Sequence, residues 1–249
     1  AKGRTAAVRA TEEDRRWPPA RVLALLARVF RLLTTPFVRY EIRGGRCADE
    51  LTVAVIAANH RSMFDAMAGL VCLHHFGHYP RLLIERRYVE HGVLGYLSRG
   101  IGAIPVDRGD GQAALDAGID ALAAGIPILV MPEGGLHWDP DRPLATGPAR
   151  TGVARLAAGG GVPVVPVALA GTERVAPPGA RFPRANPFRR KTVVCWVADD
   201  PLWLEGEDAR ADTELVMAAI RDLLARAQPL VDLTDRGGVG NVRGDEGVG

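Results

Sequence analysis

The apolar run at residues 51–58 is the feature that most limits what this chain can fold into. Its sequence, L-T-V-A-V-I-A-A, is apolar or β-branched almost throughout, which is typical of a strand buried on both faces of a parallel sheet. The chain then turns, and Met63, Met67 and Val71 recur at helical spacing. A buried strand that leads directly into a helix predicts an α/β domain.

The same alternation of strand and helix continues along the chain. Further strands are predicted at 40–45, 81–85, 101–106, 126–131, 162–169 and 191–197, and the main helices at 112–124, 151–158 and 212–227. Pro163 and Pro166 favour an edge or strand-end position for the run 162–169. These elements predict a mixed, mostly parallel sheet flanked by helices.

Length and composition limit the domain organisation. A chain of 249 residues, 47% of them hydrophobic, suits one large α/β domain, which we place at 41–232. Residues 1–40 are predicted as a tail and an amphipathic helical element, and residues 233–249 as a disordered, glycine-rich tail. The net charge of +2 predicts no nucleic-acid partner.

The N-terminal element has the pattern of an amphipathic helix. Large apolar residues between Val22 and Leu33 form a wide surface, while Arg21, Arg28 and Arg31 share a narrower basic face. The pattern fits a helix lying in a membrane interface and, equally, a helix packed on a protein core. The sequence contains no uninterrupted apolar run of about 18 residues, so no transmembrane helix is predicted.

Two residues of the turn after the first buried strand carry acid–base chemistry. His60 follows the strand, and Asp65 lies five residues later. Histidine can accept and return a proton near neutral pH, and a carboxylate commonly orients the imidazole. The two side chains can meet only if His60 lies in the turn before the helix, because five residues of helix would make them diverge. The alternative is a surface turn histidine beside a first-turn helix acid.

Three later segments complete a pattern of four motifs. They are G-A-I-P-V-D-R at 102–108, M-P-E-G-G at 131–135, and V-P-V-V-P-V-A at 162–168. With N-H-R-S-M-F-D at 59–65, in this order and at these spacings, they resemble the motifs of the glycerolipid acyltransferases. The greatest resemblance is to the 1-acylglycerol-3-phosphate acyltransferases. It covers residues 50–175, the central half of the chain.

The resemblance implies a role for each matched residue. His60 and Asp65 would be the catalytic base and its orienting carboxylate. The candidates for substrate binding are Arg61, Arg108, Glu133, Gly134 and Arg150. Without the resemblance, a solvent-exposed arginine at a strand end is the favoured interpretation of Arg108. For Glu133, the structural alternative is a buried glutamate that caps a neighbouring helix. No metal is expected at the site, and His74, His75 and His78 lack further ligands at zinc-like spacing.

The third motif departs from the family pattern. Relatives continue after Glu-Gly with threonine or serine and then arginine, whereas this chain has Gly135 and Leu136. A second arginine for the acceptor's phosphate is therefore missing from its expected place. Arg142 or Arg150 is a candidate replacement, and an acceptor other than 1-acylglycerol 3-phosphate is the alternative.

The resemblance also predicts the partners of the chain. It implies a lysophospholipid acceptor, no cofactor, and acyl-CoA or acyl-carrier protein as the donor, at the cytoplasmic face of a membrane. The basic loop around Arg181, Phe182 and Phe188 is expected to be solvated or to touch lipid headgroups or the carrier. Two other functions remain open, a non-catalytic lipid-binding module and a thioester hydrolase. The widely spaced Cys47, Cys72 and Cys195 are expected to be free thiols in a reducing compartment.

Overall fold

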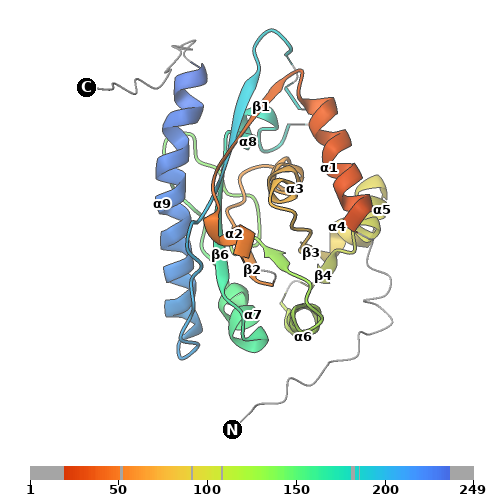
Figure 1. The fold of residues 1–249 in the computed structure, drawn as a ribbon, viewed down its shortest axis with the longest axis vertical. Helices are drawn as coiled ribbons and strands as arrows, with labels where there is room; N and C mark the ends of the chain where they lie inside the picture. The colour runs from red at the N-terminus through yellow and green to blue at the C-terminus, as the bar shows by residue number, and fades with distance from the viewer. Residues whose placement is uncertain are drawn as a thin grey trace, which may run out of the picture.

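The computed structural model describes residues 20–50, 53–90, 92–107, 109–180, 183–184 and 186–235. Within these ranges, helices cover both faces of a seven-stranded sheet (Figure 1). The strands are β1 (Val38–Gly44), β2 (Val55–Ala58), β3 (Arg81–Glu85), β4 (Ile104–Val106), β5 (Ile128–Val130), β6 (Val164–Ala170) and β7 (Lys191–Val197). The helices are α1 (Ala20–Thr34), α2 (Arg46–Glu50), α3 (Asp65–His75), α4 (Arg86–Glu90), α5 (Gly92–Gly100), α6 (Gln112–Ala123), α7 (Gly152–Gly160), α8 (Thr172–Val175) and α9 (Ala209–Asp235).

The sheet has the order β1-β7-β6-β2-β5-β3-β4. Neighbouring strands are parallel except β6 and β7, which are antiparallel, so the predicted mixed and mostly parallel sheet is confirmed. β2 lies between β5 and β6. The carboxyl ends of these three parallel strands therefore meet at one edge, where the turns that follow them come together.

Two hydrophobic cores lie on opposite faces of the sheet. Side chains alternate along β2, so Val55 and Ala57 join a core with α6, α7 and α9, whereas Ile56 and Ala58 join a core with α2 and α3. Figure 1 shows α9 against one face, with α3 and α1 on the other. Burial on both faces explains why β2 reads as a continuous apolar run.

Helix α1 packs against α3 through a narrow face and leaves a wide apolar face exposed. Leu23, Ala27 and Thr34 are buried. The exposed apolar side chains, which we call the α1 apolar face, are Val22, Leu25, Leu26, Val29, Leu32 and Leu33. One side of the helix therefore packs on the protein, and the other is an exposed apolar surface. Among the described helices, none combines the length and the apolarity needed to cross a membrane.

The boundaries of the end segments differ from those predicted. β1 begins at Val38, inside the segment assigned to the N-terminal element, and α9 continues to Asp235, beyond both the predicted helix end at 227 and the predicted tail start at 233. Pro229 lies inside α9, where its missing N–H disfavours helix. The next turn persists because Val231 is fully buried and Asp232 pairs with Arg174. Residues 1–19 and 236–249 lie outside the described part of the chain.

The run containing Pro166 is an interior strand, so the edge alternative is wrong, whereas Pro163 directly precedes β6 and takes the predicted strand-end position. β6 lies between β7 and β2, and Pro166 lies opposite Ala57 of β2. On the β7 side the ladder begins only at Val167, and the Pro166 carbonyl accepts the N–H of Ala198, just past the end of β7. The proline nitrogen, on this same side, therefore displaces no ladder hydrogen bond.

The expectation of three free thiols is wrong for two of the cysteines. Cys72 of α3 and Cys195 of β7 form a disulfide, and Cys47 is free and buried. The bonded residues are 123 positions apart in sequence. They meet because α3 packs on the face of the sheet toward which Cys195 points.

Candidate active site

The carboxylate of Asp65 organises the turn between β2 and α3. Its Oδ2 accepts the backbone N–H groups of Arg61 at 2.6 Å and Ser62 at 2.7 Å, and lies 2.9 Å from Nδ1 of His60. Asp65 is fully buried and is the first residue of α3. His60 therefore precedes the helix, and the geometric condition for pairing it with Asp65 is met.

The main chain of His60 is held from the loop that follows β5. Its N–H donates to Oε1 of Glu133 at 2.9 Å, and its carbonyl accepts the N–H of His137 at 2.7 Å. The imidazole is one fifth exposed. With Nδ1–H donating to Asp65, Nε2 keeps its lone pair and is the ring atom available to a substrate. The arrangement is that of an oriented general base.

Glu133 is a structural clamp. It is buried, and its second oxygen, Oε2, accepts the N–H of Gly147 at 2.6 Å. Burial raises the pKa of the carboxyl, and the hydrogen bonds from Gly147 and His60 act in the opposite direction. Because both oxygens accept backbone N–H groups, Glu133 positions the main chain of His60. Its contact with the acceptor stays a prediction.

Gly134 and Arg150 lie against each other. Gly134 has a φ of +63°, which favours glycine, and a Cβ there would lie 2.9 Å from Nε of Arg150, whose side chain would have to move. Its N–H donates to the carbonyl of Met131. The Arg150 side chain is exposed, and its guanidinium has no ion-pair partner in the described part of the chain.

Arg61 does not lie where a substrate-binding arginine would. Its side chain is 1% exposed. The guanidinium donates to Gln228 at 3.3 Å and to the carbonyl of Pro143, and its Cζ lies 5.0 Å from the centre of the Trp138 ring. Burial lowers the pKa of Arg61, and the nearby Glu173 acts against this shift. The predicted contact with substrate is replaced by an internal connection to α9.

The remaining candidate, Arg108, lies outside the described residues. Its neighbour Asp107 is held by Arg86, with 2.5 Å between Nε and Oδ1 and 2.8 Å between the second nitrogen and Oδ2. The fork of hydrogen bonds from Arg86 lowers the pKa of Asp107. This pair joins the chain after β3 to the chain after β4, directly before Arg108.

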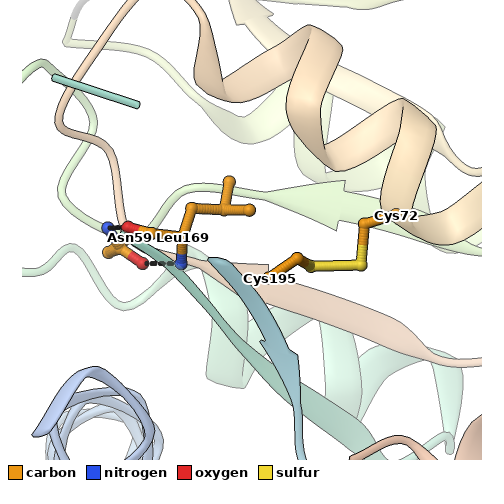
Figure 2. The surroundings of a disulfide bond; sticks show 4 residues. All are labelled: Asn59, Cys72, Leu169 and Cys195. Carbon is orange, nitrogen blue, oxygen red and sulfur yellow. Dashed lines mark hydrogen bonds between the residues drawn. A yellow bond between two sulfur atoms is a disulfide. The ribbon is translucent and has the colours of Figure 1, made fainter. Parts of the chain in front are cut away.

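Sequence reasoning missed Asn59. Its amide donates to the carbonyl of Leu169 at 2.9 Å and accepts the N–H of the same residue at 2.8 Å (Figure 2). Asn59 is fully buried at the end of β2, next to His60. The two bonds tie the catalytic turn to β6 beyond the last backbone pair of these strands, Ala58 and Val167. A polar residue directly after a buried strand is the signal that would have identified it.

No group of three metal-binding side chains is found among the residues that the structure describes. The histidines of α3 instead make local contacts. Nδ1 of His74 lies 2.7 Å from the hydroxyl of Tyr79, and the ring of His75 packs edge-on against Phe76.

A known family model matches the part of the chain that holds this turn. The model described as Acyltransferase matches residues 40–170, more than half of the chain. The protein belongs to the acyltransferase family.

Two individual proteins are similar to it. The curated 1-acyl-sn-glycerol-3-phosphate acyltransferase BAT2, chloroplastic, of Brassica napus is 27% identical over 149 residues, which are 58% of this chain and 41% of that protein. The chain thus spans about two fifths of the length of this relative. The crystal structure of the 1-acyl-sn-glycerophosphate (LPA) acyltransferase PlsC from Thermotoga maritima superimposes with a TM-score of 0.60. It covers 88% of this chain and 85% of its own at 19% identity, which shows a shared fold.

Proposed function

We propose that the protein transfers a fatty acyl group from an acyl thioester to the hydroxyl of a lysophospholipid. The acceptor we propose is 1-acylglycerol 3-phosphate, which would give phosphatidic acid, and the donor is acyl-CoA or acyl-carrier protein. The observation that carries the proposal is the His60–Asp65 pair at 2.9 Å, with no hydrogen bond to Nε2 of His60 from the residues that the structure describes. The family membership and the names of the two relatives support it.

In the proposed reaction, Nε2 of His60 takes the proton from the acceptor hydroxyl as its oxygen attacks the thioester carbonyl. The tetrahedral intermediate collapses, the C–S bond breaks, and the imidazolium returns the proton to the leaving thiolate. Asp65 stabilises the imidazolium while it exists. The proton and the acyl group are thus both accounted for without a cofactor.

The surroundings of Ser62 support direct transfer without an acyl-enzyme. Ser62 is fully buried. Its hydroxyl donates to the carbonyl of Ala176 at 2.7 Å and accepts the N–H of Phe64 at 3.0 Å. A hydroxyl committed in this way has no path to a thioester carbonyl, so the acceptor lipid itself is the nucleophile.

One observation favours a different acceptor as a second candidate. At the position where relatives carry an arginine, this chain has Leu136, which is partly exposed. An apolar side chain there offers nothing to a phosphate monoester. A panel of acceptors tests this: exclusive use of 1-acylglycerol 3-phosphate would exclude the alternative.

We further propose that the protein works at the membrane surface, on the cytoplasmic face. The α1 apolar face supports this, because six exposed apolar side chains on one helix can enter the interface of a bilayer. Arg21, Arg28 and Arg31 of the same helix would lie near anionic headgroups.

An assay of thiol release from acyl-CoA tests the function directly. Release is measured with and without 1-acylglycerol 3-phosphate, on the wild type and on His60→Ala. Release that needs both the acceptor and His60 would support the transferase. Release that needs His60 but proceeds equally without any lipid acceptor would identify a hydrolase instead, and binding of lipid without release from either donor would favour the non-catalytic module.

A further inference from the structure

A polar cavity of about 350 Å³ lies beside the catalytic turn. Its lining residues are Trp138, Glu173, Arg174, Pro177, Arg184 and Lys191. They come from the loop after β5, from α8 with the loop that follows it, and from the first residue of β7. The volume is in the range of small-ligand sites.

Both walls of this cavity contact the catalytic turn. On one side, Trp138 packs on Arg61, and the adjacent His137 donates its N–H to the carbonyl of His60. On the other side, the hydroxyl of Ser62 donates to the carbonyl of Ala176, which directly follows α8. The cavity is therefore built onto the residues that position the proposed base.

The charge of the lining is suited to an anion. Three of the six side chains are cationic and one is acidic. Arg174 is engaged by Asp232. The exposed guanidinium of Arg184 has no charged partner among the residues described, and only its backbone N–H is held, by the carbonyl of Val175. A planar guanidinium that lines a cavity and has no charged partner there is suited to phosphate.

Glu173 adds a second and different requirement. It is 2% exposed, and neither of its carboxyl oxygens has a hydrogen-bond partner in the structure. Nε of Arg174 lies 3.9 Å from its Oε1, and the buried Arg61 also acts on this carboxyl electrostatically. Buried polar groups are normally satisfied, so this carboxyl calls for a hydrogen-bond donor from a ligand. A ligand that carries a phosphate and a nearby hydroxyl meets both requirements.

We propose that this cavity binds the phosphorylated glycerol headgroup of the acceptor lipid, with its phosphate at Arg184 and Lys191 and a hydroxyl at Glu173. The proposal rests on the proposed function. It also accounts for Leu136, since a phosphate held at α8 and β7 needs no arginine in the third motif. The assignment commits to the acceptor, although CoA also carries phosphate groups.

Charge reversal at Arg184 tests the site by kinetics. The Michaelis constants for 1-acylglycerol 3-phosphate and for acyl-CoA are each measured in detergent micelles, where docking on a bilayer plays no part. Arg184→Glu is expected to raise the acceptor KM roughly tenfold and to leave kcat and the acyl-CoA KM within about twofold. Arg189→Glu is the matched control, because Arg189 is exposed on the same loop and does not line the cavity.

Three kinetic results would overturn the assignment. The first is an unchanged acceptor KM in Arg184→Glu. The second is a rise in the acceptor KM of Arg189→Glu as large as that of Arg184→Glu, and the third is a rise in the acyl-CoA KM of Arg184→Glu in place of its acceptor KM. The last would assign the cavity to the donor.

A binding measurement separates this site from the chemistry. Glycerol 3-phosphate and inorganic phosphate are titrated calorimetrically into full-length His60→Ala, with and without Arg184→Glu. Binding of glycerol 3-phosphate that exceeds binding of phosphate and is lost with Arg184→Glu supports the site, even if no transfer is ever observed. Equal binding of the two probes would show a simple anion site and contradict the headgroup assignment. Binding that is the same with and without Arg184→Glu would refute the proposed site but leave the proposed transferase function unaffected.

Discussion

Asp65 uses a single oxygen both to fold the catalytic turn and to orient His60. Oδ2 lies 2.9 Å from Nδ1 of His60 and also accepts the backbone N–H groups of Arg61 and Ser62. The orientation of the imidazole and the shape of the turn are thus set by the same buried atom, so the two properties are expected to fail together.

Substitution of Asp65 therefore tests this dual role. Asp65→Asn replaces a carboxylate that receives charge-assisted hydrogen bonds, each of about 1.5–3 kcal/mol, so both kcat and the free energy of unfolding are expected to fall. His60→Ala should reduce kcat by about 10²–10⁴-fold with little effect on stability. Activity assays and thermal unfolding of both variants make the comparison, with His75→Ala as a control for a nearby histidine. An Asp65→Asn protein as stable as the wild type would contradict the proposed folding role.

Asn59→Ala is expected to be costly although Asn59 contacts no substrate. The change leaves the N–H and the carbonyl of Leu169 without their side-chain partners, and an unsatisfied buried group costs about 1–3 kcal/mol. Chemical denaturation measures the loss. Because His60 is the next residue, kcat should fall while the acyl-CoA KM changes little. Retention of both stability and kcat would show that the Asn59 amide does not position the turn.

Glu173 predicts a pH dependence of stability. Burial raises its pKa above the ordinary value of 4.5, so the folded state holds its proton to a higher pH than the unfolded state does. The wild type is therefore expected to lose stability, relative to Glu173→Gln, as pH rises from 4.5 through the raised pKa. The melting temperatures of the two proteins should nearly coincide at pH 4, and the variant should be the more stable at pH 8. A difference that is the same at both values would disprove the assignment.

The Cys72–Cys195 disulfide should contribute substantially to stability. A closed loop with 123 residues of separation is long, and the loss of such a bond typically costs about 2–5 kcal/mol. The melting temperature of the wild type is expected to fall in a strong reductant to that of the Cys72→Ala/Cys195→Ala protein. Cys47→Ala should leave the response to reductant unchanged. Detection of three free thiols by mass spectrometry in the native protein would refute the bond.

The α1 apolar face predicts where membrane binding is lost. Leu25→Glu and Leu32→Glu should each weaken sedimentation with vesicles that contain phosphatidylglycerol, because burial of a leucine contributes about 1.5–3 kcal/mol. Leu215→Glu is the matched control, since Leu215 on α9 is 59% exposed and Leu25 is 60% exposed. If all three variants lost sedimentation with the vesicles to the same extent, the effect would be a general one of charge, which would contradict a docking role for α1.

Local sequence was enough to predict several elements and the central pair of the site. The strands at 81–85 and 191–197 have the predicted limits, because both are short apolar runs bounded by charged or turn residues. The helix predicted at 151–158 is α7, which ends at Gly160 with Gly161 as its cap at φ +61°. The pairing of His60 with Asp65 could be predicted because the two residues are only five positions apart. Whether they meet depends on the short turn between them and on no distant segment.

The roles of Arg61 and Glu133 were decided by the tertiary structure. Both were expected to bind substrate, yet Arg61 is buried against Trp138 and Gln228, and Glu133 clamps the main chain of His60. A motif places such residues at the correct edge of the sheet, but whether a charged group there faces a ligand or its own backbone depends on which loops cover it. These loops are distant in sequence, and their positions are not encoded by the motif.

The amino-acid sequence by itself determined the α/β alternation, the order of the motifs and the His–Asp pair, because these depend on side-chain periodicity and on contacts within a few residues. Only the tertiary structure decided the contacts that join remote segments. Asn59 reaches Leu169, Cys72 meets Cys195, and α9 continues past Pro229. Each depends on the packing of the completed sheet and its helices, because a local pattern carries no information about which distant residue will lie opposite it.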